Sequence, residues 1–355
     1  EYEEFSSAYV KDSAKIYKNH YGIPHIIAQS EKSAFFAMGY CQAQSRMWQM
    51  DILRRSASGR LSEVFGKRML DADKLMKILN FNGMAENDMS RISAKSKEIL
   101  NAYAAGVNQY LERHSHNLAF EFGAAGFHPE PWKAEDCLLI SRLTAFIMAK
   151  SFRGDLFFGE AAEQMSSAKA LSLLPEYPED APRILDKKLS GKHDKYGSDS
   201  SLVFYYENSE GNIVSEFSEY FDQAAGLLDL PLNTSASNAW ARKRDLNGES
   251  GAVLANDPHL ALALPSSWYQ AHITVPGKMN VTGASLAGSP LFLVGRNDYI
   301  SWGITNAMFD DFDFFIEKVD TSNADFYIAP GGTRKKFRMY PDTVFIKDAD
   351  PEIYY

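Results

Sequence analysis

Two short stretches of the chain combine side chains that could do chemistry. The first, Ser237-Asn238-Ala239-Trp240, places a hydroxyl beside a carboxamide, and the second, Asn256-Asp257-Pro258-His259, ends in a histidine. A serine hydroxyl attacks a carbonyl carbon readily only when a nearby base takes its proton, and histidines and amines are suitable bases. Ser237 is therefore a candidate nucleophile. Among the histidines, the pattern favours a functional role over a structural one only for His259.

A third stretch, Asp310-Asp311-Phe312-Asp313, holds three carboxylates within four residues. Hard divalent cations such as Ca²⁺ take oxygen ligands of this kind, and a backbone carbonyl can join them. An acidic turn has the same composition and is the more common structure. Taken alone, the cluster indicates a turn first and a metal site second.

The composition limits what kind of protein this is. With 355 residues, 45% of them hydrophobic, the chain can form one large domain or two ordinary ones around a packed core. Its net charge of −9 argues against a nucleic-acid partner, and solubility alone is a common explanation for such a charge. Cys41 and Cys137 are too few for a disulfide framework, so we expect both in the core. No apolar run reaches ~18 residues, so no membrane span is expected.

The candidate residues must be positioned by helices that are expected mainly in the first half of the chain and by strands expected mainly in the second half. Apolar residues recur at helical spacing over residues 31–54, with Ser30 as a plausible N-cap, and again over 92–114 and 132–150. Residues 120–131 are rich in Gly and Pro and are expected to form a loop. Residues 14–28 are expected to form an extended pair, and four further strands are expected at 251–256, 269–275, 279–286 and 290–295. Helices followed by strands predict an α+β fold.

Two features of the sequence leave alternatives open. Residues 184–218 are loosely patterned, so they are a linker or processed spacer, or equally an exposed charged loop. Ser166 and Lys169 satisfy an S-x-x-K pattern, which occurs often by chance, and no K-T-G accompanies it. The penicillin-binding type of serine enzyme is therefore a weak alternative.

Nucleotide-binding glycine loops, H-E-x-x-H and a complete nucleophile elbow are absent from the sequence.

Several stretches, in order and spacing, together resemble the penicillin acylase family of N-terminal nucleophile amidohydrolases. In the stretch at residues 39–46, Ser45 stands where an aspartate is usual in the family. The matching stretches are Tyr21-Gly22-Ile23-Pro24-His25-Ile26, Gly39-Tyr40-Cys41-Gln42-Ala43-Gln44-Ser45-Arg46, Arg54-Arg55, Gly59-Arg60-Leu61-Ser62-Glu63, Pro129-Glu130-Pro131-Trp132-Lys133-Ala134-Glu135-Asp136, Ser237-Asn238-Ala239-Trp240, Asn256-Asp257-Pro258-His259-Leu260 and Ser301-Trp302-Gly303-Ile304-Thr305-Asn306.

The resemblance implies a four-layer αββα sandwich decorated by helices. It divides the chain into a helical α chain at residues 1–170, a linker or processed spacer at 171–236, and the start of a β chain at 237–355. Members of the family continue for several hundred residues further, so we expect this sequence to be a fragment of the full protein.

The resemblance also implies a mechanism. Self-cleavage at Ala236–Ser237 would make Ser237 a terminal residue that carries both the nucleophilic hydroxyl and a free amine, which would act as its base through a bridging water. An α-amine has a pKa of about 7.7–8.0, close to the working pH. Ser235 is the competing nucleophile, and the Asn-x-Trp spacing favours Ser237. A second cut would release spacer from within residues 170–236.

Other roles are carried over position by position. The backbone N–H of Asn306 would bind the oxyanion, and His259 would orient the terminal amine or its water. Acyl-group selection would fall to four apolar residues, which are Met148, Phe152, Leu260 and Val294. A Ca²⁺ site would use Asp310, Asp313, the Phe312 carbonyl and Glu160, although Glu160 aligns only with a small insertion.

The implied function is a self-processing amidohydrolase that cleaves the side-chain amide of an acylated small molecule. Candidate substrates are penicillins or cephalosporins, N-acyl-homoserine lactones, or other N-acyl amines. The resemblance further implies a periplasmic heterodimer of α and β chains without an organic cofactor. A non-catalytic binding protein that keeps the scaffold is the alternative from a different class.

Overall fold

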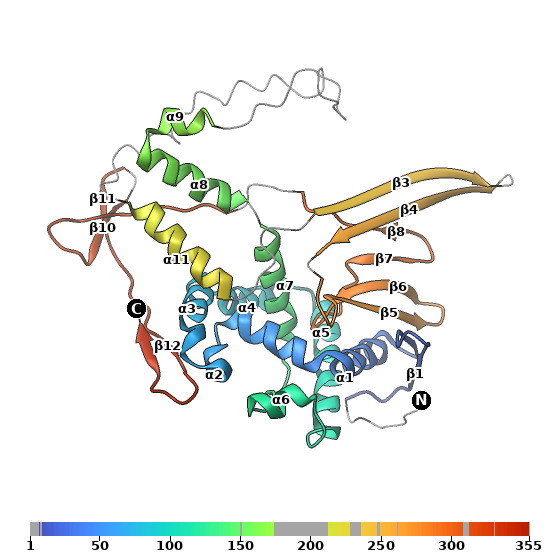
Figure 1. Ribbon diagram of the computed structural model, residues 1–355. Coiled ribbons are helices and arrows are strands. Elements are labelled where there is room, and N and C mark those ends of the chain that lie inside the picture. The colour runs from blue at the N-terminus through green and yellow to red at the C-terminus, as the bar shows by residue number, and fades with distance from the viewer. Residues whose placement is uncertain are drawn as a thin grey trace. The chain divides into compact units, whose positions relative to one another are not determined.

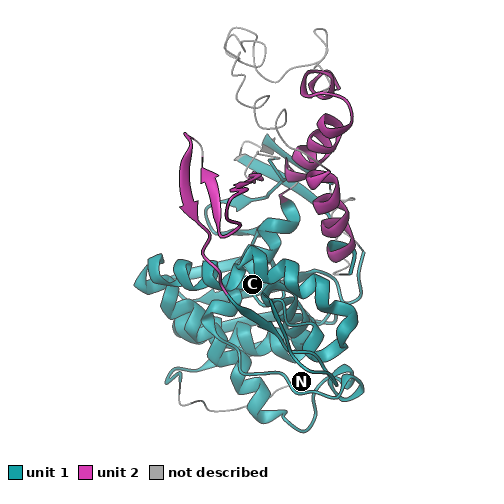
Figure 2. Cartoon of the chain, turned by 90° about the vertical axis from the view of Figure 1, so that its left-hand side faces the viewer, with its two compact units in different colours: residues 1–148, 225–307, 341–355 teal, residues 149–224, 308–340 magenta. Residues whose placement is uncertain are grey.

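The structure is a computed structural model that describes residues 7, 9–149, 151–173, 212–227, 236–246, 249–260, 262–307, 312–329 and 331–354. Within them, two compact units are present (Figure 2). Unit 1 comprises residues 1–148, 225–307 and 341–355, and unit 2 comprises 149–224 and 308–340. Asp310, Asp311 and most of the expected spacer at 171–236 lie outside the described residues.

The long helix α1 (Glu31–Ser58) begins where the sequence predicted. The Ser30 hydroxyl oxygen accepts a hydrogen bond from the backbone N–H of Ser33, which confirms the predicted N-cap. The helix runs one turn beyond the predicted end and stops at Gly59, whose φ of 64° lies in the left-handed region that glycine adopts without steric cost.

Helices α1 and α5 (Ala94–Arg113) pack against each other at very short range. A Cβ placed on Gly39 would lie 2.1 Å from the Tyr103 carbonyl oxygen, and one placed on Gly106 would lie 1.9 Å from that of Phe36. Because real atoms do not approach so closely, each glycine lets one backbone reach the other helix. This pair of contacts fixes α5 on α1.

The helices predicted at 92–114 and 132–150 are present as α5 and α7 (Ala134–Met148), whereas the prediction for residues 120–131 needs a correction. Residues 120–131 were predicted as a loop, but α6 occupies the first part of this segment. The Phe122 side chain is 2% exposed there, and burial of an aromatic ring outweighs the low helix propensity of glycine. The other helices of unit 1 are α2 (Ser62–Phe65), η1 (Lys67–Met69), α3 (Leu70–Leu79), α4 (Phe81–Arg91) and α6 (Phe120–Ala125).

Unit 1 contains a six-stranded mixed sheet with the order β1-β2-β5-β6-β7-β8. Only the β2–β5 pair is parallel. Its strands are β1 (Ala14–Lys18), β2 (Pro24–Ala28), β5 (Trp268–Val275), β6 (Met279–Leu286), β7 (Val294–Asn297) and β8 (Ser301–Trp302). The last predicted strand, 290–295, is displaced, because β7 starts only at Val294.

One face of this sheet carries the core. Ile26, Ala271 and Ile273 are almost fully buried and join a cluster with residues of α1 and α5. Cys41 and Cys137 are buried free thiols in the same cluster, as predicted. Helices packed on a mixed sheet confirm the α+β class, whereas the four-layer arrangement stays a prediction.

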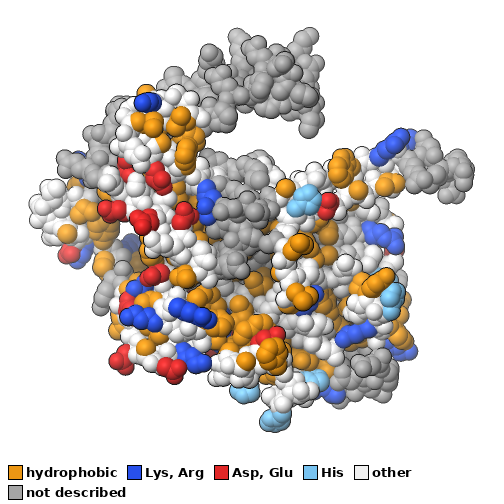
Figure 3. Space-filling model, in the orientation of Figure 1, with side chains coloured by type: hydrophobic (Ala, Val, Ile, Leu, Met, Phe, Trp, Pro, Cys, Tyr) orange, Lys and Arg blue, Asp and Glu red, His pale blue; other side chains and the backbone are white. Residues whose placement is uncertain are grey.

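Strands β3 (Ala236–Leu246) and β4 (Glu249–His259) form a separate antiparallel hairpin. Figure 1 shows it as a long arm beside β7 and β8. Hydrophobic side chains lie exposed on this arm (Figure 3), among them Trp240 at 62% and Val253 at 46%. The hairpin belongs to unit 1, but its strands form a separate two-stranded sheet.

The other elements are short. Unit 1 also contains the pair β12 (Asp342–Val344) and β13 (Glu352–Tyr354). Among its described residues, unit 2 contains helices α8 (Ser151–Gln164) and α9 (Ser167–Leu171), most of α11 (Ile213–Leu227), whose last three residues belong to unit 1, and strands β9 (Lys318–Val319), β10 (Phe326–Ala329) and β11 (Thr333–Lys336). Across the described parts of the chain, no helix combines the length and the apolar character needed to cross a membrane.

We predict that Gly106→Ala destabilises unit 1, because the new methyl group would collide with the Phe36 carbonyl. Overpacking of this kind costs about 1–3 kcal/mol. Helix propensity alone would give the opposite sign, a gain of about 1 kcal/mol. Denaturant unfolding of the variant measures the difference.

The matched control is Gly123→Ala in α6, where a Cβ would meet nothing within 4 Å. It should leave stability unchanged or raise it slightly. A Gly106→Ala variant as stable as Gly123→Ala would contradict the proposed close approach of α1 and α5.

Candidate active site

Ser237 is the second residue of β3, directly after Ala236. Its cross-strand partner is Pro258, and Ala236 is paired with His259. The side chain is half-buried. The stretches 237–240 and 256–259, singled out in the sequence, are thus the two facing ends of one hairpin.

The register nevertheless separates two side chains that the sequence suggested as partners. Successive side chains in a strand point to opposite faces, and directly paired residues share a face. Ser237 therefore lies on the face of Pro258 and Asn256. His259 lies on the other face, where its Nε2 is 2.7 Å from Oδ2 of Asp257. The imidazole and the Ser237 hydroxyl are not brought together as side chains.

Asn256 links the hairpin to the loop that follows β8. Its Nδ2 group donates to the carbonyl oxygen of Asn238 at 2.9 Å and to that of Ile304 at 3.0 Å. Its Oδ1 accepts from the backbone N–H of Ile304 at 3.0 Å. The residue after Ser237 and the residue two before Asn306 are thus held by one side chain.

Asn306 lies at the other end of the same loop. Its Nδ2 donates to the backbone carbonyl of Met148 at 2.5 Å. Met148 is the last residue of α7, where helix carbonyls have no partner within the helix. These contacts therefore connect strand β3, at the residue after Ser237, to the loop that carries Asn306 and from there to Met148.

An apolar pocket of about 320 Å³ lies next to this end of α7. Met148 and Leu260, two of the four predicted acyl-binding residues, line it. The rest of its wall, which sequence patterns did not single out, comes largely from α1 and α7 and includes Ile52, Leu53, Ile140, Leu143 and Ile147. Their helical spacing marks them as an apolar face, but that signal does not distinguish a pocket wall from core.

The other two predicted pocket residues lie elsewhere. Val294 is the half-buried first residue of β7 and is not among the residues that line this pocket. Phe152 belongs to unit 2, where its buried ring packs at 5.2 Å from that of Phe221 and at 5.5 Å from that of Phe312.

The described residues include only part of the predicted calcium site. Glu160, Phe312 and Asp313 are described in unit 2, whereas Asp310 lies outside the described residues. Where the structure describes the chain, no group of three or more His, Cys, Asp or Glu side chains could hold a metal ion. Two carboxylates and one carbonyl are fewer than the six to eight oxygens that Ca²⁺ takes. The calcium site stays a prediction.

The S-x-x-K pattern has a structural explanation. Ser166 is the N-cap of α9, and its hydroxyl oxygen accepts from the backbone N–H of Lys169 at 3.3 Å. Serine is favoured at this position for that hydrogen bond alone.

Comparison with known proteins identifies the family. The penicillin amidase family model matches residues 13–355. The chain belongs to the penicillin amidase family. This confirms the resemblance drawn from the sequence motifs.

Individual relatives carry two kinds of name. The chain is 32% identical over 343 residues to an acyl-homoserine lactone acylase QuiP from Pseudomonas syringae pv. syringae, covering 96% of this chain and 39% of that protein. It is 24% identical over 385 residues to the penicillin G acylase of Escherichia coli, covering 96% and 44%. The chain therefore spans about two fifths of the length of these relatives.

A solved structure is also similar. The thermostable penicillin G acylase from Alcaligenes faecalis matches with 23% sequence identity and a TM-score of 0.42, covering 49% of this chain and 97% of that one.

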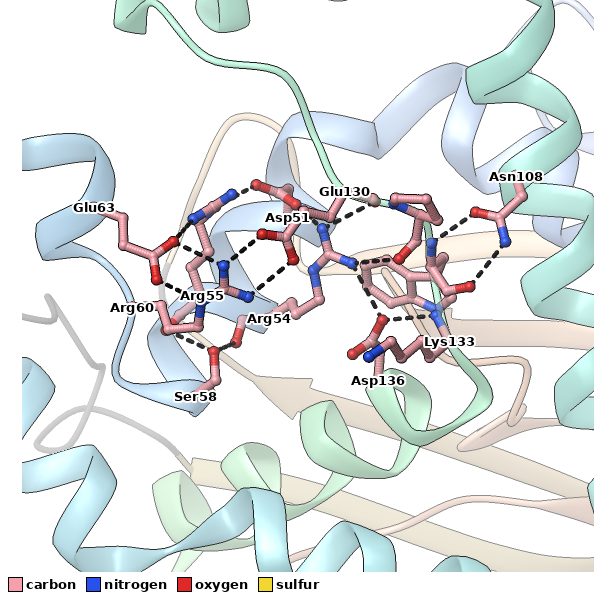
Figure 4. Close-up of polar contacts among 12 residues, drawn as sticks. Asp51, Arg54, Arg55, Ser58, Arg60, Glu63, Asn108, Glu130, Lys133 and Asp136 are labelled. Atoms are coloured by element: carbon pink, nitrogen blue, oxygen red, sulfur yellow. Dashed lines mark hydrogen bonds and ion pairs between the residues drawn. The ribbon is translucent and has the colours of Figure 1, made fainter. Parts of the chain in front are cut away.

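Three of the stretches that resemble the penicillin amidase family, at residues 54–55, 59–63 and 129–136, contribute to an ion-pair network and not to the candidate active site (Figure 4). Asp51 is fully buried on α1 and accepts from both Arg54 and Arg55. Arg54 also donates to the Pro131 carbonyl and to Asp136. The network ties the end of α1 to the turn that leads into α7. Because buried charges are costly unless paired, these motif positions need both partners for structural reasons.

The outer end of the network is partly exposed. Arg60 donates to Glu63 and to Glu130. Hydrogen bonding to Arg60 lowers the pKa of Glu130 to about 2. Glu130 is therefore ionised in the folded protein at pH values where the same carboxyl in the unfolded chain is protonated.

We predict that this carboxylate contributes stability above pH 4.5, and that the contribution disappears as the pH falls to about 2. Glu130→Gln should flatten the decline of the unfolding free energy over this range. The difference should stay below ~1 kcal/mol, because the pair is half-exposed and screened by solvent. Unfolding curves measured at several pH values test this.

The control is Glu112→Gln, at an exposed position on α5. It should leave the acid limb of the profile as in the unmodified protein. A Glu130→Gln profile that coincides with the Glu112→Gln profile would remove the proposed contribution of the Arg60 pair.

Proposed function

We propose that the chain is the part of a self-processing amidohydrolase that carries the nucleophile, Ser237, and the wall of an acyl pocket. The observation that carries the proposal is the series of contacts from the Ser237 strand through Asn256 and the Asn306 loop to Met148 beside the pocket. Family membership supports the same reaction class.

Maturation would begin at the bond between Ala236 and Ser237. The Ser237 hydroxyl attacks the preceding carbonyl carbon, the C–N bond breaks, and water hydrolyses the resulting ester. The products are a carboxylate on Ala236 and a free α-amine on Ser237. Because this amine has a pKa near 7.7–8.0, roughly neutral solution leaves part of it unprotonated as a base.

Turnover would then use the same residue twice. The amine takes the proton of the Ser237 hydroxyl, through a water molecule, as Oγ bonds to the acyl carbon of the substrate. The backbone N–H of Asn306 donates to the oxyanion, and one such donor is typically worth ~3 kcal/mol. Collapse of the intermediate expels the amine product, which takes up the proton, and water releases the acyl group.

We assign His259 a supporting role that its geometry allows. The new amine is a main-chain atom, so it lies in the plane of the β3–β4 ladder and is accessible from both faces. His259, paired with Ala236 and held by Asp257, lies on the face opposite the Ser237 side chain. From there it orients the amine or its bound water without contacting Oγ.

The substrate would be an N-acyl small molecule with an apolar acyl group. The pocket at Met148 and Leu260 has mainly apolar walls, and its volume of about 320 Å³ is at the low end for ligand sites. N-acyl-homoserine lactones and penicillin-type amides both combine such an acyl group with a polar amine. The names of the relatives include both classes.

The organisation of the mature protein is proposed on the same basis. Residues 1–170 would form the α chain, residues 171–236 would include the released spacer, and the β chain would begin at Ser237. The two chains would stay together as a heterodimer in the periplasm, and Ca²⁺ would bind at the acidic segment around Asp313.

We predict that Ser237→Ala in the full-length precursor abolishes both self-cleavage and amide hydrolysis, since both steps need the same hydroxyl. Denaturing gels and N-terminal sequencing of the large chain give the first readout, and release of amine from N-acyl amides gives the second. Ser166→Ala and Ser235→Ala are the controls and should keep both activities.

Two results would count against the proposal. A mature large chain that begins elsewhere than Ser237 would reject the cleavage site. An intact, inactive wild-type protein that Ser237→Ala does not change would indicate a binding protein with the same scaffold.

We predict that Leu260→Phe shifts the preference toward shorter acyl groups, because the larger side chain fills part of the pocket. Each methylene that can no longer be buried costs ~0.8 kcal/mol, or about fourfold in kcat/KM. A series of substrates with graded acyl length measures the shift. Leu262→Phe is the control, since Leu262 is fully exposed two residues away. An unchanged length profile for Leu260→Phe would separate this pocket from acyl binding.

A further inference from the structure

The side chain of Asn256 connects the Ser237 strand to the Asn306 loop but has no chemical role in the mechanism proposed above. We propose that Asn256 is a positioning residue that sets the distance between the nucleophile strand and the loop carrying the oxyanion donor. The proposal rests on the function proposed above for Ser237 and Asn306.

The contact has the form of a β-bridge made by a side chain. Asn256 exchanges two hydrogen bonds with the backbone of Ile304, one to its carbonyl and one from its N–H, each 3.0 Å long. Two strands of an antiparallel pair exchange bonds in the same way. A third bond, from Nδ2 to the Asn238 carbonyl at 2.9 Å, returns to β3. The carboxamide therefore joins strand β3 to a loop outside its ladder.

The chemistry of this contact is specific for asparagine. The site requires two donors and one acceptor on a short planar group, which is the inventory of a carboxamide. Aspartate of the same shape would place a carboxylate oxygen against two carbonyl oxygens. Glutamine would need room for one more methylene group.

Gly303 supplies the space for the contact. A Cβ at this position would lie 2.8 Å from Cβ, Cγ and Oδ1 of Asn256. A substituted residue would therefore push the loop away from the carboxamide. The absence of a side chain at position 303 thus makes room for the carboxamide at position 256.

The location of the contact gives it a consequence for catalysis. It holds the backbone one residue after Ser237 and two residues before Asn306. The far end of the loop is fixed independently, by the bond from Asn306 to the Met148 carbonyl. Loss of Asn256 would free the hairpin to move relative to the loop, and a displacement of about 1 Å at a reacting centre can cost ~10²-fold in rate.

Asn297 offers a matched control in the neighbouring turn. Its Oδ1 accepts from the backbone N–H groups of Tyr299 and Ile300, at 2.8 Å each. Like Asn256, it is a half-buried asparagine that binds backbone groups, but its bonds stay within the turn between β7 and β8. Loss of Asn297 should cost comparable hydrogen bonds without separating the hairpin from the loop.

The test compares Asn256→Ala, Asn256→Asp, Gly303→Ala and Asn297→Ala in the full-length precursor. Self-cleavage rate, kcat and KM for an N-acyl amide are measured for each. Because the oxyanion forms only in the transition state, the first three variants should lose ~10²-fold in kcat while KM changes less than about threefold. Asn297→Ala should keep the wild-type kcat, and its thermal stability should match that of Asn256→Ala.

A second readout does not need activity. In an uncleaved Ser237→Ala background, deuterium exchange of the peptide covering residues 301–306 reports the Ile304 N–H. Adding Asn256→Ala should speed exchange there, whereas adding Asn297→Ala should not. This measurement also tests the proposal for a variant that fails to mature, because it does not require cleavage or activity.

Wild-type kcat in Asn256→Ala, an equal loss in Asn297→Ala, or unchanged exchange at residues 301–306 would each overturn the proposal. If the wild-type precursor neither matures at Ser237 nor hydrolyses amides, the proposed function fails first, and the positioning role fails with it. If the wild type is active, a loss of kcat in the Asn256 variants together with faster deuterium exchange at residues 301–306 supports both the proposed function and the positioning role.

Discussion

The side-chain carboxamide of Asn256 is the interaction on which the candidate site depends. Strands β3 and β4 pair only with each other among the described residues, so no backbone ladder holds Ser237 beside the six-stranded sheet. Three hydrogen bonds from one side chain replace that ladder at the point nearest to Ser237. The proposed nucleophile and the proposed oxyanion donor are therefore coupled through a side chain that has no chemical role in the proposed reaction.

The remaining structure provides a rigid support for this contact. The glycines at 39 and 106 bring α5 onto α1, and the buried Asp51–Arg54–Arg55 network ties α1 to the turn before α7. Helices α1 and α7 then form most of the pocket wall, and α7 ends at the carbonyl that Asn306 binds. The stretches that carry the family resemblance thus divide into a group that builds this support and a group that lies at the candidate site.

Sequence patterns predicted the local features and part of the site. The Ser30 cap, the α+β class and the placement of Met148 and Leu260 on one pocket followed from spacing and resemblance. Contacts between distant segments did not. The bond from Asn306 to Met148 joins positions 158 residues apart. Asn256 stands in an Asn-Asp-Pro stretch that is typical of a turn, so its role becomes visible only with Ile304 beside it. The opposite faces of Ser237 and His259 depend on the hairpin register, which the sequence alone left unspecified.

The central claim is that Ser237 carries the acyl group during turnover. Mass spectrometry of the mature full-length enzyme, acid-quenched while it hydrolyses an N-acyl amide, tests this most directly. The account predicts that the peptide beginning at Ser237 gains the mass of the acyl group, with the modification on the serine oxygen. An acyl group found on another residue, or steady turnover with this peptide unmodified at every quench time, would contradict it.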